Sequence, residues 1–206
     1  MPHVVVNEGE QTLEKLPETW GKLLAGVDRD AAARGEVVTA VRFDGVDEPT
    51  FRQPAHAALP LTGFERIEIE TTPPSELIDE ALAQGALSLA ALSAAAAQTG
   101  DAFRGVDLAG ANQGLMELAE GVRSMVAILA TGAQALGVDL QQMTRDGRSV
   151  AAQITELSGQ LESIIDAQQA HDWLTVADIL EYDLEPALKR WRPIFDTLRA
   201  SVRPAA

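Results

Sequence analysis

The chain has 206 residues, of which 46% are hydrophobic and 23% charged, and its formal net charge is −15. This apolar fraction is typical of a globular protein, and the length allows one large or two small domains. Because the chain contains no cysteine, disulfides, thiolate nucleophiles and sulfur-ligated metals are excluded. The excess of acidic residues argues against nucleic acid binding, which needs a positively charged surface.

Two segments bear on location. The N-terminal run of residues 1–6 lacks the charged start, long apolar core and small-residue cleavage site of a secretory signal, so the sequence predicts a cytoplasmic protein. Residues 81–97 form a weakly polar run that is mostly alanine. It falls short of the strongly apolar composition of a bilayer-spanning helix, so we expect a tightly packed soluble helix and no membrane span.

The pattern of the sequence changes at residues 71–74, Thr-Thr-Pro-Pro. Before this point, β-branched residues recur in short alternating runs. After it, the apolar residues follow helical spacing to the end of the chain. We therefore predict an α+β chain with a small first domain over residues 1–72 and an acidic helical domain over residues 75–203.

The first domain is predicted to hold short strands around one helix. Strands are expected at 3–7, 36–43 and 64–70, weaker return strands at 11–13 and 50–52, and a helix from about residue 17 to residue 35. Asp44-Gly45 is typical of a two-residue hairpin turn. The resulting order, strand, strand, helix, strand, strand, strand, resembles the β-grasp arrangement of ubiquitin-like domains. No di-glycine tail or cluster cysteines accompany it, so neither conjugation nor electron transfer is implied.

The second domain is predicted to contain four helices, at about 75–98, 101–136, 146–170 and 172–202. Short connections are expected at Gly100, at Gly137-Val138 and at His171, which favours an antiparallel four-helix bundle. Glycines in the first half of the second helix weaken it, so a break or loose start is expected there.

The fourth helix carries the clearest apolar stripe, with members three and four residues apart: Trp173, Ala177, Leu180, Leu184, Leu188, Trp191, Phe195 and Leu198. Pro186 and Pro193 lie inside it, so the sequence predicts a kink or two segments meeting near Pro186. Such a kink either fits the helix to its neighbours or presents aromatic and arginine side chains to a partner.

Charge is also ordered along this helix, with acidic residues in its first half and basic residues in its second. Asp178, Glu181 and Glu185 share one face opposite the apolar stripe, which is typical of a solvated acidic face. The order either complements the helix macrodipole or forms a polarised docking surface. Our candidate partner-binding residues are Asp178, Glu181, Tyr182, Glu185, Trp191 and Arg192.

Motifs of catalysis and cofactor binding are missing from the sequence. The three histidines are isolated, and there is no Gly-x-Ser-x-Gly elbow, no Glu-x-x-His pair of a di-iron bundle, no EF-hand pattern and no phosphate-binding glycine loop. We therefore predict no cofactor, no metal and no catalytic residue.

The segment Leu174-x-x-Ala-Asp-x-Leu-Glu-Tyr-x-Leu-x-Pro-x-Leu-x-x-Trp191 resembles the C-terminal segment of a poorly characterised group of bacterial proteins. These proteins also place a short β-rich domain before an acidic helical region. The resemblance implies a bacterial protein with a reusable helical module and nothing catalytic.

Three functions remain open. The first is a non-enzymatic interaction or scaffolding protein that binds a protein partner or itself, as a homo-oligomer. The second is an acidic chaperone or adaptor for an exported or filament-forming protein. The third is an enzyme with an inter-domain site that uses Glu36, Arg42, His56 or His171.

Overall fold

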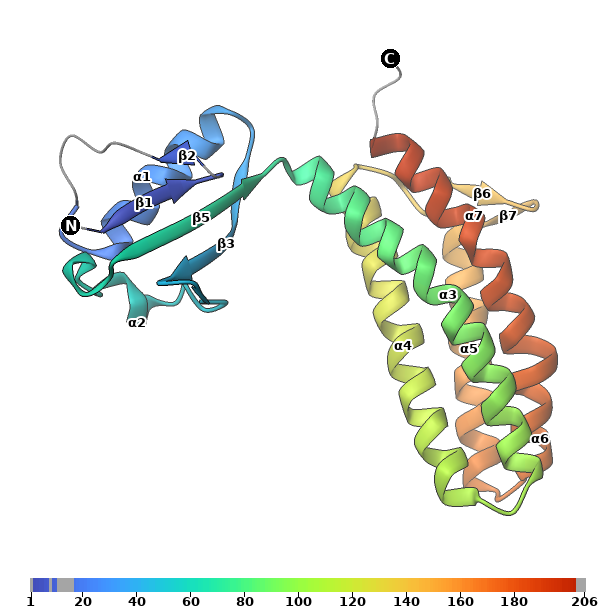
Figure 1. The fold of residues 1–206 in the computed structure, drawn as a ribbon. Helices are drawn as coiled ribbons and strands as arrows, with labels where there is room; N and C mark the ends of the chain where they lie inside the picture. The colour runs from blue at the N-terminus through green and yellow to red at the C-terminus, as the bar shows by residue number, and fades with distance from the viewer. Residues whose placement is uncertain (1, 8, 11–16, 203–206) are drawn as a thin grey trace. The chain divides into compact units, whose positions relative to one another are not determined.

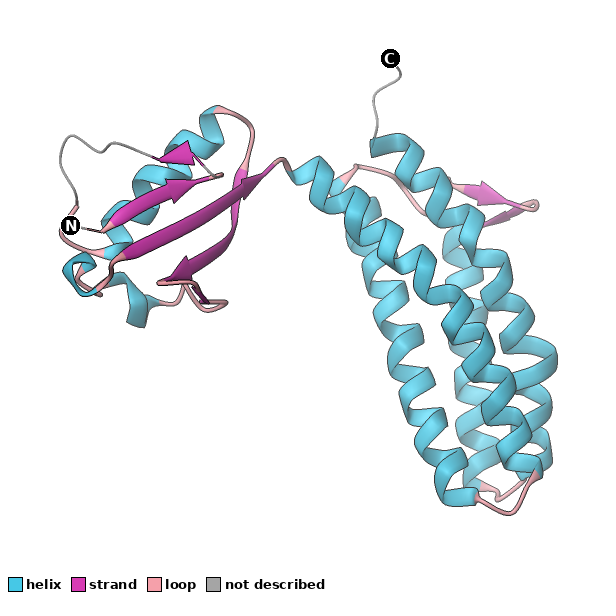
Figure 2. Cartoon of the chain, in the orientation of Figure 1, coloured by secondary structure: helices cyan, strands magenta, loops and turns pink. Residues whose placement is uncertain are grey.

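Residues 1–77 and 78–206 form two units of the computed structural model, which describes residues 2–7, 9–10 and 17–202 (Figure 1). The first unit is a small sheet with helical elements and the second is mostly helical (Figure 2). The predicted α+β class is therefore confirmed at this level. The division between the units falls just after the Pro73-Pro74 pair, within the first turn of a long helix.

The first unit contains, in chain order, β1 (His3–Val6), β2 (Gly9–Glu10), α1 (Trp20–Ala33), β3 (Val37–Phe43), β4 (Val46–Asp47), α2 (Pro54–Ala57), the short 3-10 helix η1 (Leu61–Gly63) and β5 (Arg66–Thr72). The sheet order is β2-β1-β5-β3-β4, with β1 and β5 parallel and the other pairs antiparallel. β5 is therefore the central strand, with the β1–β2 hairpin on one side and the β3–β4 hairpin on the other.

The core of this unit lies between α1 and one face of the sheet. Alternation along β5 buries Ile67 and Ile69, while helical spacing turns the apolar residues of α1 onto them. Trp20 is fully buried at the start of α1, where its ring meets Phe43 edge to face at 5.0 Å. Its indole Nε1 donates a hydrogen bond of 2.8 Å to the carbonyl oxygen of Phe51, so the one polar atom of this side chain is satisfied.

Three strand predictions of the first unit need comment. The turn at Asp44-Gly45 is present, with φ of 51° and 81°, and the return strand is β4, so the predicted strand at 50–52 is wrong. Residues 48–51 form a turn instead, because Glu48 accepts a hydrogen bond from the Thr50 amide and Phe51 is buried. The predicted strand at 11–13 lies outside the described residues.

The second unit contains α3 (Pro74–Arg104), α4 (Leu108–Ala135), the hairpin strands β6 (Thr144–Arg145) and β7 (Arg148–Ser149), α5 (Val150–Gln169), α6 (Trp173–Asp178), the π-helical segment η2 (Ile179–Leu184) and α7 (Glu185–Val202). Side-chain N-caps begin three of the helices: Asp107 for α4, Ser149 for α5 and Asp172 for α6. The connections at Gly137 and His171 are confirmed, and both residues have positive φ.

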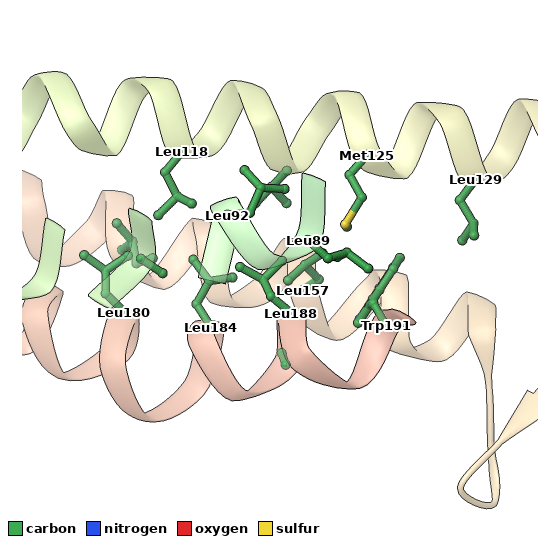
Figure 3. Close-up of a cluster of buried hydrophobic side chains, with 14 of the residues drawn as sticks. Leu89, Leu92, Leu118, Met125, Leu129, Leu157, Leu180, Leu184, Leu188 and Trp191 are labelled. Atoms are coloured by element: carbon green, nitrogen blue, oxygen red, sulfur yellow. The ribbon is translucent and has the colours of Figure 1, made fainter. Parts of the chain in front are cut away.

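Apolar side chains from α3, α4, α5 and the α6–η2–α7 stretch share one core (Figure 3). The labelled members of this core in Figure 3 are Leu89, Leu92, Leu118, Met125, Leu129, Leu157, Leu180, Leu184, Leu188 and Trp191. Every predicted stripe residue from Ala177 to Leu198 on the last stretch is buried. The helical periodicity therefore located the inward face correctly.

Three helix boundaries were predicted wrongly. The second helix begins at Leu108 and not at about residue 101, so the expected loose start lies outside the helix. The first helix does not stop at Gly100 but continues to Arg104. Gly100 is buried against α6, where an added Cβ would lie 3.3 Å from the carbonyl oxygen of Ala177, so this glycine allows close helix packing and is not a stop signal. The third helix begins at Val150 and not at Asp146, because Asp146-Gly147 forms the turn of the β6–β7 hairpin.

The expected irregularity near Pro186 is present as the π-helical segment η2, which ends directly before Glu185. Proline has no amide hydrogen, so the carbonyl one turn earlier loses its α-helical donor. A π segment is one way in which a helix adjusts around such a residue. Leu180 and Leu184 on η2 are both fully buried, so the adjustment keeps the apolar stripe on the core.

Candidate interaction surfaces

Asp178 and Glu181, two of the predicted partner-binding residues, both form ion pairs with Arg104 at the end of α3. Arg104 Nη2 lies 2.8 Å from Asp178 Oδ1, and Nη1 lies 2.5 Å from Glu181 Oε2. These hydrogen bonds, led by the one that Arg104 donates to Asp178, raise the pKa of Arg104 above its ordinary value. The pair therefore links α3 to the α6–η2 stretch, and Arg104 compensates one of its two negative charges.

Glu185 is also engaged within the molecule. Ser93 Oγ donates a hydrogen bond of 3.1 Å to Glu185 Oε1, and the Lys189 ammonium forms an ion pair with the same carboxylate. The hydrogen bond from Lys189 is the main reason that the pKa of Glu185 lies below its usual value, and Ser93 contributes less. Partial burial opposes this shift because it disfavours the charged form.

The remaining three predicted residues differ in exposure. Tyr182 is 65% exposed and Arg192 is at the surface, so both are free to meet a partner. Trp191 is only 2% exposed and packs in the core of the helical unit. It could not contact a partner without unfolding, because it belongs to the inward stripe. The six residues therefore do not form one continuous surface.

The residues of the enzyme hypothesis lie in separate environments. Glu36 accepts hydrogen bonds from Thr71 Oγ1 and from Arg34, and these lower the pKa of Glu36, with Thr71 the larger cause. His56 Nε2 lies 3.6 Å from a carboxylate oxygen of Glu48. Among the described residues, no group hydrogen-bonds to the buried His56 Nδ1.

His171 belongs to the helical unit, where it is exposed and its ring lies edge-on to Trp173 at 5.4 Å. The described part of the chain holds no group of three or more His, Asp or Glu side chains placed to bind a metal ion.

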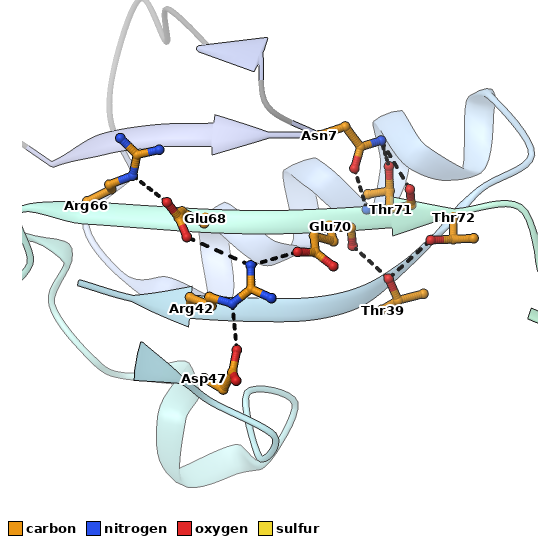
Figure 4. Close-up of polar contacts among 9 residues, drawn as sticks. All are labelled: Asn7, Thr39, Arg42, Asp47, Arg66, Glu68, Glu70, Thr71 and Thr72. Atoms are coloured by element: carbon orange, nitrogen blue, oxygen red, sulfur yellow. Dashed lines mark hydrogen bonds and ion pairs between the residues drawn. The ribbon is translucent and has the colours of Figure 1, made fainter. Parts of the chain in front are cut away.

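On the exposed face of the sheet, Arg42 forms ion pairs with several acidic side chains (Figure 4). Its guanidinium lies 2.6 Å from Asp47 and 2.7 Å from Glu70, with Glu68 at 4.0 Å. These partners, led by Glu70, raise the pKa of Arg42. The broad hollow over this face measures about 680 Å³, and its charged side chains pair with each other, so the face is polar and internally compensated.

The outward face of α3 is different because its middle stretch carries no charge. Residues 81–100 contain no Asp, Glu, Lys or Arg. Five exposed residues on this stretch repeat at alternating spacings of three and four, and we call them the α3 seam: Gln84, Leu87, Ala91, Ala94 and Gln98. Leu87 is 61% exposed. Beside the seam a groove of about 310 Å³ runs between α3 and α4, lined by Ala91, Ala95 and Gly114 among others.

α3 is long and apolar enough to cross a membrane by length and composition alone, and 33% of its most apolar window is buried within the structure. This is weak evidence, since the core helix of a soluble protein meets the same criteria. The alanine-rich run was recognised in the sequence as a closely packing helix. Its uncharged outer face was missed, because the pattern does not say which side of an alanine-rich helix points outward.

Residues 81–194 match a family described as a domain of unknown function, DUF8042. The match covers more than half of the chain. The chain belongs to this family. The matched DUF8042 region begins in α3 and ends in α7, so it lies within the helical unit. The comparison with curated proteins gives no match, and the comparison with solved structures gives none either. Membership of an uncharacterised group, as the sequence suggested, is confirmed; the bacterial origin and the C-terminal motif of that group stay predictions.

Proposed function

We propose that the protein is a non-enzymatic scaffold that associates with a second copy of itself through the α3 seam. The observation that carries this proposal is the absence of charge from residues 81–100 in a chain of net charge −15. Two such chains repel each other over most of their surface. An uncharged helix face is the place where they approach at the smallest electrostatic cost.

The order of residues in the α3 seam is self-complementary. In an antiparallel pair centred on Ala91, each Gln84 meets the partner's Gln98, and each Leu87 meets the partner's Ala94. Amide then faces amide and a large side chain faces a small one, as a two-fold symmetric interface requires. Small residues also permit helix axes to approach at the short end of the usual 8–10 Å range.

The size of the seam predicts a weak association. Twenty helical residues extend roughly 30 Å, and a strip about 10 Å wide buries about 300 Å² on each copy, or about 600 Å² in total. Stable interfaces bury at least about 1,200 Å². The dimer is therefore expected to form only as the concentration rises, unless the neighbouring face of α4 contributes.

Salt gives a second expectation. Beyond the seam the antiparallel register places Glu80 of one copy near Asp101 of the other, and both residues are exposed. These like charges oppose association at low ionic strength. The Debye length is about 10 Å at 0.1 M salt, so added salt is expected to strengthen the dimer.

Light scattering after size exclusion, over a range of concentrations and at low and high salt, tests the proposal. The mass is expected to rise from 21.9 kDa towards twice that value, more readily at high salt. Ala91→Glu places two charges at the centre of the pair and is expected to restore the monomer. Ala152→Glu on the exposed surface of α5 makes the same exchange elsewhere and is expected to associate normally.

A mass that stays at the monomer value throughout would overturn the proposal, as would an association that Ala91→Glu leaves intact. Sedimentation with neutral lipid vesicles separates the remaining possibility: pelleting of the chain with vesicles would assign α3 to a membrane and reject the dimer.

The fold assignments form part of the same proposal. Supporting a β-grasp domain are the sheet order β2-β1-β5-β3-β4 and the position of α1 between the two hairpins. An antiparallel four-helix bundle is supported by the single core shared by α3, α4, α5 and the α6–η2–α7 stretch. A rigid bundle would hold the α3 seam straight.

A further inference from the structure

Three arginines from three elements converge on one small hollow of the helical unit. Arg145 comes from β6, Arg148 from β7 and Arg190 from α7. The hollow has a volume of about 70 Å³, and Gln153, Glu156 and Trp191 also line it. In a chain with 31 acidic and 16 basic residues, three arginines around one hollow run against the overall charge.

The hairpin places two of these arginines directly opposite each other. Arg145 and Arg148 are direct partners in the antiparallel register of β6 and β7, and like charges in this position destabilise a strand pair. The turn between them, Asp146-Gly147, has positive φ at both residues, so the two strands and their side chains are held in a fixed register. Local conflicts of this kind concentrate at functional sites.

Internal acidic groups compensate the cluster only in part. Arg148 Nη1 lies 2.6 Å from Glu156 Oε2, and Arg145 Nε lies 3.9 Å from Asp146 Oδ1. Arg190 forms no ion pair with any residue that the structure describes. The hollow therefore holds three positive and two negative side chains, and one guanidinium remains available to an anion.

We propose that this hollow binds a phosphate group, free or at the end of a small molecule. Arginine forks donate paired N–H groups that match phosphate oxygens. The volume exceeds that of a single water site but lies well below the 300–1,000 Å³ of pockets that enclose whole small molecules. The site takes one oxyanion group, and any remainder of the ligand projects into solvent.

Nuclear magnetic resonance titration of the full chain with inorganic phosphate, at constant ionic strength and a pH near 8, tests this inference. Saturable shifts are expected in the amides of residues 144–149 and in one indole N–H signal. Arg190→Gln is expected to weaken binding at least tenfold. Arg192→Gln removes the same charge two residues away, does not line the hollow, and is expected to bind as the unaltered chain does.

Arg145→Gln provides a second variant on another element, with the same expected loss. Absence of saturable shifts, or equal weakening by Arg190→Gln and Arg192→Gln, would overturn the proposal, since the latter indicates only nonspecific attraction. A parallel titration with glycerol 3-phosphate distinguishes the two sources: tighter binding than inorganic phosphate identifies a terminal monoester, and equal binding identifies the free ion.

Discussion

Glycines on the long helices meet their neighbours so closely that a single methyl group decides the packing. At Gly85 of α3 an added Cβ would lie 2.5 Å from Cε1 of Phe195, whose ring is fully buried. At Gly121 of α4 the nearest atom is the tip of the Leu92 side chain, which borders the groove between α3 and α4. The first neighbour is fixed by the core, whereas the second can rotate.

Gly85→Ala is therefore expected to destabilise the helical unit by about 1–2 kcal/mol, since overpacking costs about 1–3 kcal/mol and the gain in helix propensity returns up to about 1 kcal/mol. Gly121→Ala is expected to be close to neutral. Gly159→Ala, with no atom within 4 Å of the new Cβ, is the control and is expected to be stabilising. Urea denaturation followed by circular dichroism measures all three; equal losses for Gly85→Ala and Gly121→Ala would contradict the packing argument.

The depressed pKa of Glu185 makes a pH-dependent contribution to stability. A group whose pKa is lower in the folded state stabilises the fold above its unfolded value, here 4.5, and this contribution is lost as the pH falls through the folded value. Glu185→Gln is expected to cost about 1 kcal/mol at pH 7, through its bonds to Ser93 and Lys189. The difference from the unaltered chain should shrink below pH 4.5. Denaturation at pH 7 and pH 3.5 checks this, and an equal difference at both values would exclude the carboxylate as the cause.

Among the elements, the α6–η2–α7 stretch shows what helical periodicity can and cannot predict. Its spacing located the buried face from Ala177 to Leu198, and Pro186 located the irregularity. The same stripe placed Trp191 in the core, which is incompatible with its predicted role in partner binding. Trp191 was grouped with Tyr182 and Arg192 because the three are close in sequence. Its burial shows that it does not share a surface with them.

Helix ends depended on contacts that no local pattern contains. Glycine is a residue type typical of helix ends, yet α3 continues through Gly100 because α6 packs against this residue. The β6–β7 hairpin was missed because its strands have only two residues each, too few for an alternation to be recognised. The hollow lined by Arg145 and Arg190 was missed for a different reason, since its residues are distant in sequence.

The N-cap of α5 gives a prediction at this scale. Ser149 Oγ accepts a hydrogen bond of 3.1 Å from the amide of Ala152. Ser149→Ala removes this acceptor and is expected to destabilise the helical unit by about 1 kcal/mol, whereas Ser149→Asn retains a capping acceptor and is expected to be near neutral. Thermal denaturation of both variants measures the difference. A similar loss in Ser149→Asn would instead assign the effect to strand pairing in β7.

For the whole molecule, the sequence predicted the mixed class and the change from strands to helices, because both follow from the period of the apolar residues. The pairing of β1 with β5 could not be predicted from this period, since those strands lie more than sixty residues apart. The candidate surfaces were the least predictable feature. Leu82, Leu87 and Leu89 are chemically identical, yet only Leu87 is exposed, and this depends on how α3 packs against the rest of the core.

Each unit buries its own apolar cluster, and the two clusters share no residue. Ile67 is fully buried in the sheet unit and Leu129 in the helical unit. Large-to-small substitution in a core costs about 2–5 kcal/mol. Because each cluster is closed within its unit, we expect Ile67→Ala to lower the unfolding midpoint of the sheet unit alone, and Leu129→Ala that of the helical unit alone.

Two probes separate these transitions. Circular dichroism at 222 nm follows mainly the helical unit, whereas the indole N–H signal of Trp20 in nuclear magnetic resonance spectra follows the sheet unit, in which this side chain is buried. Independent cores predict that each substitution moves one probe and leaves the other unchanged. If both substitutions moved both probes together, the two units would unfold as one cooperative structure, and a scaffold with separately stable parts would be the wrong description of this chain.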